Sequence, residues 1–154
     1  MGASGWSYTV PWQADPDAAL RELHKRVFAE GDYWWAEGGY WVSNEDVPAE
    51  KRAAVPPPAS LTDLIAAEQV AYDGTHSILD MARVLRPGEE PGHCTVEMVT
   101  ADESRRTAGT DRPTRDHLDA LDDLVRGRWM GRCVVLHHAA GDPAELHFWG
   151  YSGD

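Results

Sequence analysis

The segment 131–150 constrains the fold of this 154-residue chain more than any other, because it contains two alternating runs separated by a Gly141-Asp142-Pro143 turn cluster. This pattern predicts a β-hairpin, in which successive side chains point to opposite faces of a sheet. With a loop at 139–143, one face of the hairpin buries Val134, Leu136, Leu146 and Phe148. The opposite face then carries His137, Glu145, His147 and Trp149.

Two imidazoles and a carboxylate on one sheet face suggest a metal site. Neighbouring side chains on such a face lie about 5 to 7 Å apart, within reach of one ion, and this donor set suits iron or zinc. His137, Glu145 and His147 are therefore the candidate ligands. A loop shifted by one residue replaces His137 with His138, and the sequence does not decide between them. The same residues are equally compatible with a solvated polar surface.

The rest of the chain alternates between predicted strands and helices. Residues 6–12 form a strand that Pro11 places at a sheet edge or ends. A helix is expected to begin at Asp15-Pro16 and to end at Gly31. Further helices are expected at 61–70, 100–109 and 114–127, and further strands in a hairpin over 32–43 and at 74–85 and 93–99. A short helix fits 74–85 equally well, and its β-branched residues favour the strand.

This order of elements predicts a single α+β domain that spans residues 1–154. Several consecutive strand pairs indicate a mainly antiparallel sheet, with the helices packed on one face and the hairpin at the C-terminal end. Residues 44–60, which include Pro56-Pro57-Pro58, are expected to form a proline-rich connecting loop.

The chain has 14 basic and 26 acidic residues, which give a formal net charge of −12. A field of this sign repels phosphate, so neither nucleic acid nor an anionic membrane surface is an expected partner. It suits a cationic protein or a cationic small molecule, although acidity also keeps a protein soluble. The two cysteines do not have metal-binding spacing, and the sequence has neither an export-type start nor an apolar run long enough to span a membrane. These features predict a cytoplasmic protein.

Aromatic residues are concentrated in one short segment. The chain has seven Trp against two Phe, and Trp is seldom buried completely because its N–H needs a partner. The candidate binding residues, for a protein interface or a cation cage, are Tyr33, Trp34, Trp35, Tyr40, Trp41 and, on the final hairpin, Trp149. Because Trp34 and Trp35 must point to opposite faces of a strand, at least one is expected to be substantially exposed. The alternative is that alternate rings fill the core.

His76 and Asp80 form a second candidate site, of a catalytic kind. A His four residues before an Asp suits a general base oriented by a carboxylate, provided that both lie on one helical turn. In a strand the two side chains would be too far apart for a direct hydrogen bond. The favoured interpretation is a turn in which the hydroxyls of Thr75 and Ser77 satisfy backbone groups.

The usual motifs of nucleotide binding, serine hydrolysis, zinc proteolysis and base deamination do not occur in the sequence. The first hypothesis is therefore a small acidic cytoplasmic binding protein, a neutralising or regulatory partner of a basic protein, that uses its aromatic patch. The alternative is a small metal-dependent enzyme, with iron or zinc held by the histidines and carboxylate of the hairpin. A metal analysis of the purified protein distinguishes these two hypotheses.

Overall fold

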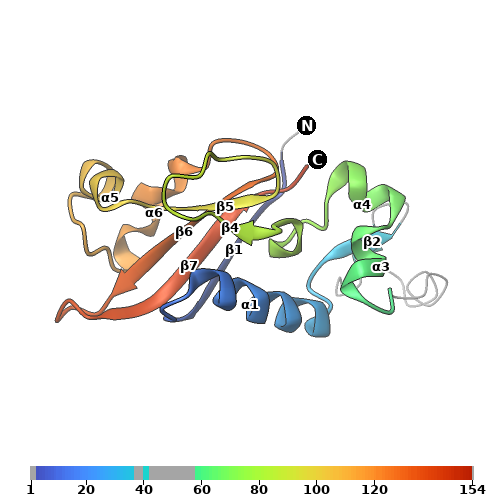
Figure 1. Ribbon diagram of the computed structural model, residues 1–154, viewed down its shortest axis with the longest axis horizontal. Helices are drawn as coiled ribbons and strands as arrows, with labels where there is room; N and C mark the ends of the chain where they lie inside the picture. The colour runs from blue at the N-terminus through green and yellow to red at the C-terminus, as the bar shows by residue number, and fades with distance from the viewer. Residues whose placement is uncertain (1–2, 37–39, 42–57, 154) are drawn as a thin grey trace.

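The computed structural model describes residues 3–36, 40–41 and 58–153, and its centre is a five-stranded sheet in the order β1-β7-β6-β5-β4 (Figure 1). The strands are β1 (Gly5–Pro11), β4 (Arg83–Val84), β5 (Thr95–Met98), β6 (Met130–His137) and β7 (Pro143–Tyr151). β1, β7 and β6 pair antiparallel, whereas β6, β5 and β4 pair parallel. The α+β class is confirmed, but the sheet is mixed rather than mainly antiparallel. The helical segment between β5 and β6 returns the chain across the sheet, as parallel pairing requires.

The helical segments follow the predicted order, but most are shorter than expected. They are α1 (Pro16–Glu30), α3 (Leu61–Ile65), α4 (Glu68–Asp73), η1 (Ile78–Asp80), α5 (Ala101–Ala108), η2 (Arg115–His117), α6 (Leu118–Leu121) and η3 (Asp122–Leu124). The Asp15 side chain caps the start of α1, and Gly31 ends this helix with a φ of 70°. The strand expected over 74–85 is largely wrong, because the Ser77 side chain caps η1 and only β4 is extended.

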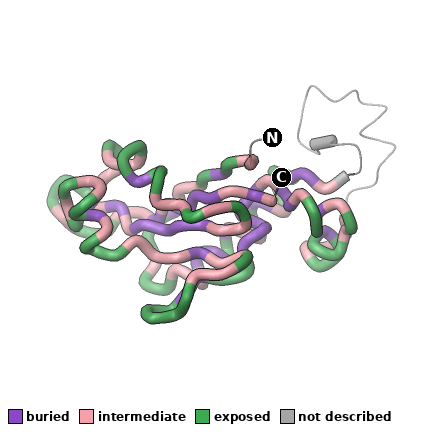
Figure 2. The backbone as a smooth tube through the Cα atoms, turned by 90° about the horizontal axis from the view of Figure 1, so that it is seen from above, coloured by how far each residue is buried: buried purple, intermediate pink, exposed green. Residues whose placement is uncertain are grey.

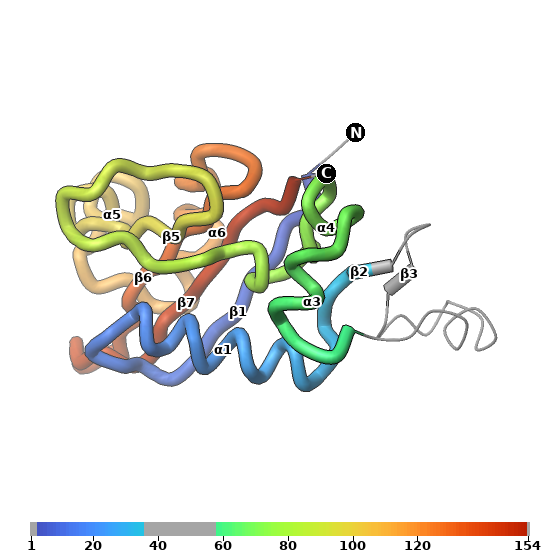
Figure 3. The backbone as a smooth tube through the Cα atoms, turned by 45° about the vertical axis from the view of Figure 1, so that its right-hand side comes forward, coloured from blue at the N-terminus to red at the C-terminus, as the bar shows by residue number. Residues whose placement is uncertain are grey.

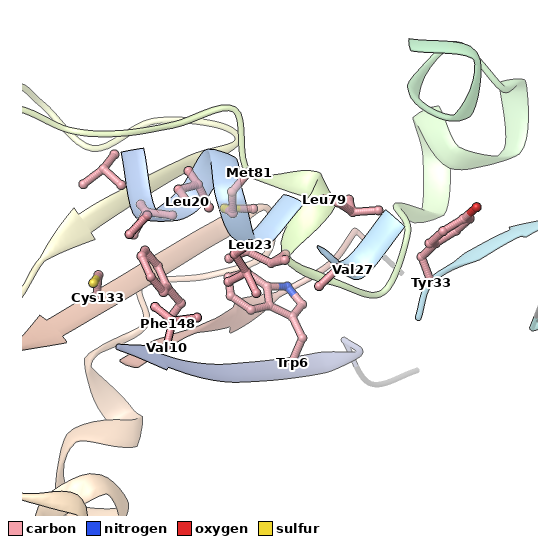
Figure 4. Packing of buried hydrophobic residues seen from close by; sticks show 14 of the residues in the cluster. Trp6, Val10, Leu20, Leu23, Val27, Tyr33, Leu79, Met81, Cys133 and Phe148 are labelled. Atoms are coloured by element: carbon pink, nitrogen blue, oxygen red, sulfur yellow. The ribbon is translucent and has the colours of Figure 1, made fainter. Parts of the chain in front are cut away.

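Helices cover both faces of the sheet, so the expectation that they pack on one face is wrong. On one face, Leu20, Leu23 and Val27 of α1 belong to the same buried cluster as Phe148 of β7 (Figure 4). On the other face, Leu121 of α6 packs in a second cluster with Val134, Leu136 and Trp149. Seen from above, the buried residues run through the central strands, and exposed residues mark the outer helices and loops (Figure 2).

The hairpin formed by β6 and β7 has a register one residue away from the expected one. His147 lies opposite Val134 and Phe148 lies opposite Cys133, with a β-bulge between Leu136 and His137. Val134 and Leu136 therefore share a face with His147 and Trp149, and not with Phe148. The four residues expected to be buried, Val134, Leu136, Leu146 and Phe148, are all buried. These residues are buried because helices cover both faces of the sheet, and not because all four lie on the same face.

Trp6 lies across the middle of the sheet, on the α1 side. A Cβ atom added at Gly131 would come within 2.9 Å of the Trp6 ring, and one added at Gly150 within 2.4 Å. These two glycines face each other on β6 and β7, so the absence of side chains at both positions makes room for the indole. β1 is thereby fixed against the hairpin, with its other edge at the border of the sheet.

β2 (Trp34–Ala36) stands at the other end of the molecule from α5 and α6 (Figure 3). It forms a separate two-stranded sheet with β3 (Tyr40–Trp41), and the two strands pair antiparallel as expected for the segment 32–43. The Trp34 backbone N–H donates to the Thr75 carbonyl at 2.7 Å, which joins β2 to the turn before η1. The expected proline-rich loop lies outside the described residues, apart from residues 58–60.

Candidate functional site

A groove of about 470 Å³ lies beside the face of the hairpin that carries His147 and Trp149. Its lining residues come from β1, from β7 and from the α6–η3 segment: Ser7, Leu118, Asp119, Leu121, Asp122, His147 and Trp149. Ser7 pairs with Trp149 and Thr9 pairs with His147, so side chains from two adjacent strands share this face. The groove is therefore built where the edge of the sheet meets α6.

Two rings form the strand side of the groove. His147 and Trp149 are two residues apart on β7, which places their rings on one face, with centroids 5.5 Å apart. The Trp149 indole N–H donates to the Asp122 carbonyl at 3.3 Å, and Thr9 Oγ1 lies 2.7 Å from His147 Nδ1. Trp149 is only 4% exposed, whereas His147 is half-buried. His147 is thus the ring that a ligand can reach, and Trp149 supports it.

Two exposed aspartates form the helical side of the groove. Asp119 lies in α6 and Asp122 begins η3, three residues later. Residues three apart on a helix lie on the same side. The sequence shows this spacing, because Asp119 and Asp122 directly follow Leu118 and Leu121, which are also three residues apart. The two aspartates were nevertheless not among the predicted site residues. Sequence alone gave no reason to bring them next to His147.

Burial lowers the pKa of His147, and the positive charge of Arg115 acts in the same direction. Asp122 and Glu145 oppose this effect but do not overcome it. The imidazole is therefore neutral at pH 7. With this ring neutral, Asp119 and Asp122 supply the charge of the groove lining, which is negative and suits a cationic group.

The three predicted metal ligands are not brought together. Glu145 accepts hydrogen bonds from the Arg115 side chain at 2.8 Å (Nε) and 2.5 Å (Nη2), and this contact lowers its pKa. His137 follows the bulge, and its backbone N–H donates to the Pro113 carbonyl at 2.8 Å. His138 lies exposed in the turn. Among the described residues, which include all of these, no group of three or more His, Cys, Asp or Glu side chains could hold a metal ion.

The aromatic segment contributes to the core and not to the groove. Tyr33 stacks on Phe28 with centroids 5.5 Å apart, and Trp34, 4% exposed, stacks on His76 at 5.3 Å. Trp35 is half-buried against the main core. The prediction that one of the adjacent indoles is substantially exposed is therefore wrong, because α4 packs against β2 and the Trp34 N–H is bonded to the turn before η1. The side chains of Tyr40 and Trp41 lie outside the described part of the chain.

Asp80 is held by hydrogen bonds from Thr75 and Ser152, and the charge of His76 also acts to lower its pKa. One carboxylate oxygen accepts the Thr75 backbone N–H at 2.6 Å, and the other accepts the Ser152 hydroxyl at 2.6 Å. Ser77 Oγ lies 2.8 Å from Thr75 Oγ1 and accepts the Leu79 N–H. Burial raises the pKa of Asp80, although these hydrogen bonds act against it. The geometry matches the hydrogen-bonded turn that was favoured over a catalytic pair, and it ties the C-terminal segment to η1.

A larger cavity of about 620 Å³ lies at the start of α1, beside β4. Three of its charged residues already have partners, since Arg83 pairs with Glu89 at 2.7 Å and Asp17 accepts the Val84 N–H at 2.9 Å. The groove at His147 is the better candidate because two exposed aspartates and a half-buried ring line it together.

Comparison with known proteins finds no family model that matches the chain, no curated protein that matches it and no solved structure that matches it. In the described residues, no helix is long and apolar enough to cross a membrane.

Proposed function

We propose that this chain is a small acidic binding protein whose groove between α6 and the hairpin holds a cationic side chain of a basic protein partner. The observation that carries the proposal is that Asp119 and Asp122 line the same groove as the His147 ring. In this role the protein neutralises or regulates its partner and performs no chemistry of its own.

Two features favour a cation in the groove. Carboxylates attract a guanidinium or ammonium group more strongly when they border a partly desolvated hollow than when they lie in open solvent. The excess of acidic residues, which gives the chain its net charge of −12, accelerates the encounter with a basic partner. The cation-binding residues are therefore Asp119, Asp122, His147 and its support Trp149.

The two cysteines are consistent with a cytoplasmic role. Cys133 is buried and Cys94 is half-buried, and neither forms a disulfide. Free buried thiols are typical of proteins in reducing compartments. We propose that the encounter with the basic partner takes place in the cytoplasm.

The proposal is tested by the affinity of a hexa-arginine peptide for two charge-matched variants, measured by calorimetry. The double variant Asp119→Asn/Asp122→Asn removes both groove charges, and we expect roughly tenfold weaker binding. The control Glu22→Gln/Glu30→Gln removes two exposed charges from α1, which covers the opposite face of the sheet. The control should bind within about twofold of the natural protein.

Equal losses in the two variants would mean that the peptide responds only to the net charge of the protein, and the proposal would be wrong. Salt supplies a second criterion. Raising the salt concentration from about 0.05 M to about 0.5 M shortens the reach of the field and should weaken binding. An affinity independent of salt would also contradict the proposal.

A further inference from the structure

β1 is the border strand of the main sheet, and its outer edge carries backbone groups that no other described segment pairs with. β1 pairs with β7 on one side only, over Gly5 to Pro11. The Trp12 N–H donates to the Ala144 carbonyl, and the Ser152 N–H donates to the Ser4 carbonyl. These two bonds fix which residues of β1 point their backbone groups toward β7.

In an antiparallel pair, residues whose backbone groups face the partner alternate with residues whose groups face away. Positions 4 and 12 face β7, so the even-numbered residues between them do as well. The N–H and C=O groups of Gly5, Ser7 and Thr9 therefore point outward. Pro11, which lacks an N–H, ends this series. The sheet thus offers an open edge about five residues long, from residue 5 to residue 9.

The same outward-facing residues lie on the groove side of the sheet. Ser7 lines the groove, and Thr9 contacts His147 at 2.7 Å. A strand added beside β1 would place every second side chain on this face, next to Ser7. Those side chains would extend over the groove toward Asp119 and Asp122. The open edge and the acidic groove therefore form one continuous surface.

We infer that the partner segment is an extended basic peptide that adds to the sheet as a strand along β1 and inserts a Lys or Arg side chain into the groove. Main-chain hydrogen bonds to Ser7 and Thr9 supply the alignment, and the aspartates supply the charge preference. This inference rests on the proposed function and specifies its ligand. A second copy of this chain is the less suitable occupant, because pairing two β1 edges would bring two acidic grooves together in molecules that each carry a charge of −12.

The test uses a seven-residue peptide of alternating threonine and arginine, with blocked ends, titrated into the natural protein. Two further peptides carry N-methyl groups, one on its arginines and the other on its threonines. Both keep the full charge, but each loses the N–H groups along one edge only. If the peptide binds as a strand, one methylated peptide should bind roughly tenfold more weakly than the parent, and the other about as well. An antiparallel strand predicts that methylation of the arginines is harmful, and a parallel strand predicts that methylation of the threonines is.

The protein side of the edge is tested with Ser7→Pro, which removes an outward N–H, and with Ser7→Ala, which keeps it. Proline is tolerated at an edge position whose N–H faces away from the sheet. Circular dichroism establishes whether Ser7→Pro is folded. The folded variant should bind the parent peptide several-fold more weakly than Ser7→Ala does, and if it does not fold, the methylated peptides alone decide.

The outcomes separate this inference from the proposed function. If both methylated peptides bind equally well, strand addition is wrong, while a loss confined to Asp119→Asn/Asp122→Asn would still support the cation groove. If one methylated peptide binds weakly but Asp119→Asn/Asp122→Asn binds the parent peptide normally, strand addition along β1 is supported and the cation groove is wrong. Sedimentation equilibrium of the protein alone tests the remaining occupant. A dimer that resists salt and that Ser7→Pro dissociates would show that a second copy occupies the edge, and it would overturn the inference.

Discussion

Arg132 is a buried charged residue that the sequence analysis did not single out. It lies on β6 with 2% of its surface exposed, and its guanidinium donates to Glu103 of α5 at 2.7 Å, to Glu97 of β5 at 3.0 Å and to the Leu124 carbonyl of η3 at 3.2 Å. Although burial acts to raise the pKa of Glu103, hydrogen bonds from Thr100 and Arg132 leave it lowered. Arg132 thus holds α5 and η3 against the sheet, next to the segment that lines the groove.

Replacing Arg132 should therefore destabilise the whole fold. The change Arg132→Ala leaves the partly buried Glu103 carboxylate without its cation and Glu97 with Arg126 alone, and we expect the free energy of unfolding to fall by about 3 kcal/mol. Urea denaturation measures this. Arg105→Ala is the matched control, because the ion pairs of Arg105 with Asp102 and Asp111 lie at the surface and contribute little. If the two variants unfolded at the same urea concentration, the structural role of Arg132 would be wrong.

At the scale of elements, the hairpin shows what sequence alternation can and cannot predict. Period-two patterns located both of its strands and the four buried hydrophobic residues. They did not fix the register, because a bulge at Leu136 and His137 shifts one strand by a single position. That shift moved Val134 and Leu136 to the face of His147 and Trp149. It also separated His137 from the metal site that the pattern predicted.

The hairpin also predicts how pH affects binding. Because burial holds the pKa of His147 below its usual value of about 6.5, the folded protein resists protonation of this ring. As the pH falls below about 6.5, the unfolded chain takes up a proton at this residue before the folded protein does, so the fold loses stability. At a lower pH the folded ring also gains charge and repels a cation in the groove. The affinity for the hexa-arginine peptide, which stays charged throughout, should therefore be constant near neutral pH and should fall only once the pH is below the usual His pKa of about 6.5.

Two variants test whether this pH dependence of the affinity arises from His147. His147→Gln should flatten the pH profile measured by calorimetry. His138→Gln changes an exposed imidazole in the nearby turn and should leave the profile as it is. An identical fall in affinity for all three proteins would show that the titration belongs to another group.

For the whole molecule, local patterns predicted the element order and the α+β class, but not the way the elements are assembled. Capping residues placed α1 and α5 correctly. The parallel pairing of β4, β5 and β6 depends on contacts between distant segments, which no local period encodes. Coverage of both sheet faces follows from the same assembly. Tyr33 and Trp34 are buried by other distant contacts, with Phe28 of α1 and with His76. The binding hypothesis therefore no longer rests on Tyr33, Trp34 and Trp35, and among the predicted binding residues whose side chains the structure describes, Trp149 is the one that lines the groove.

The central claim is that a cation enters the groove between α6 and the hairpin, and amide and indole chemical shifts during titration with the hexa-arginine peptide test it most directly. The account predicts that the largest shifts arise from the Trp149 indole N–H, which is bonded to the Asp122 carbonyl, and from the amides of Ser7 and Asp119. Shifts centred on Asp15 and Asp17 at the start of α1, with the Trp149 indole signal unmoved, would contradict it.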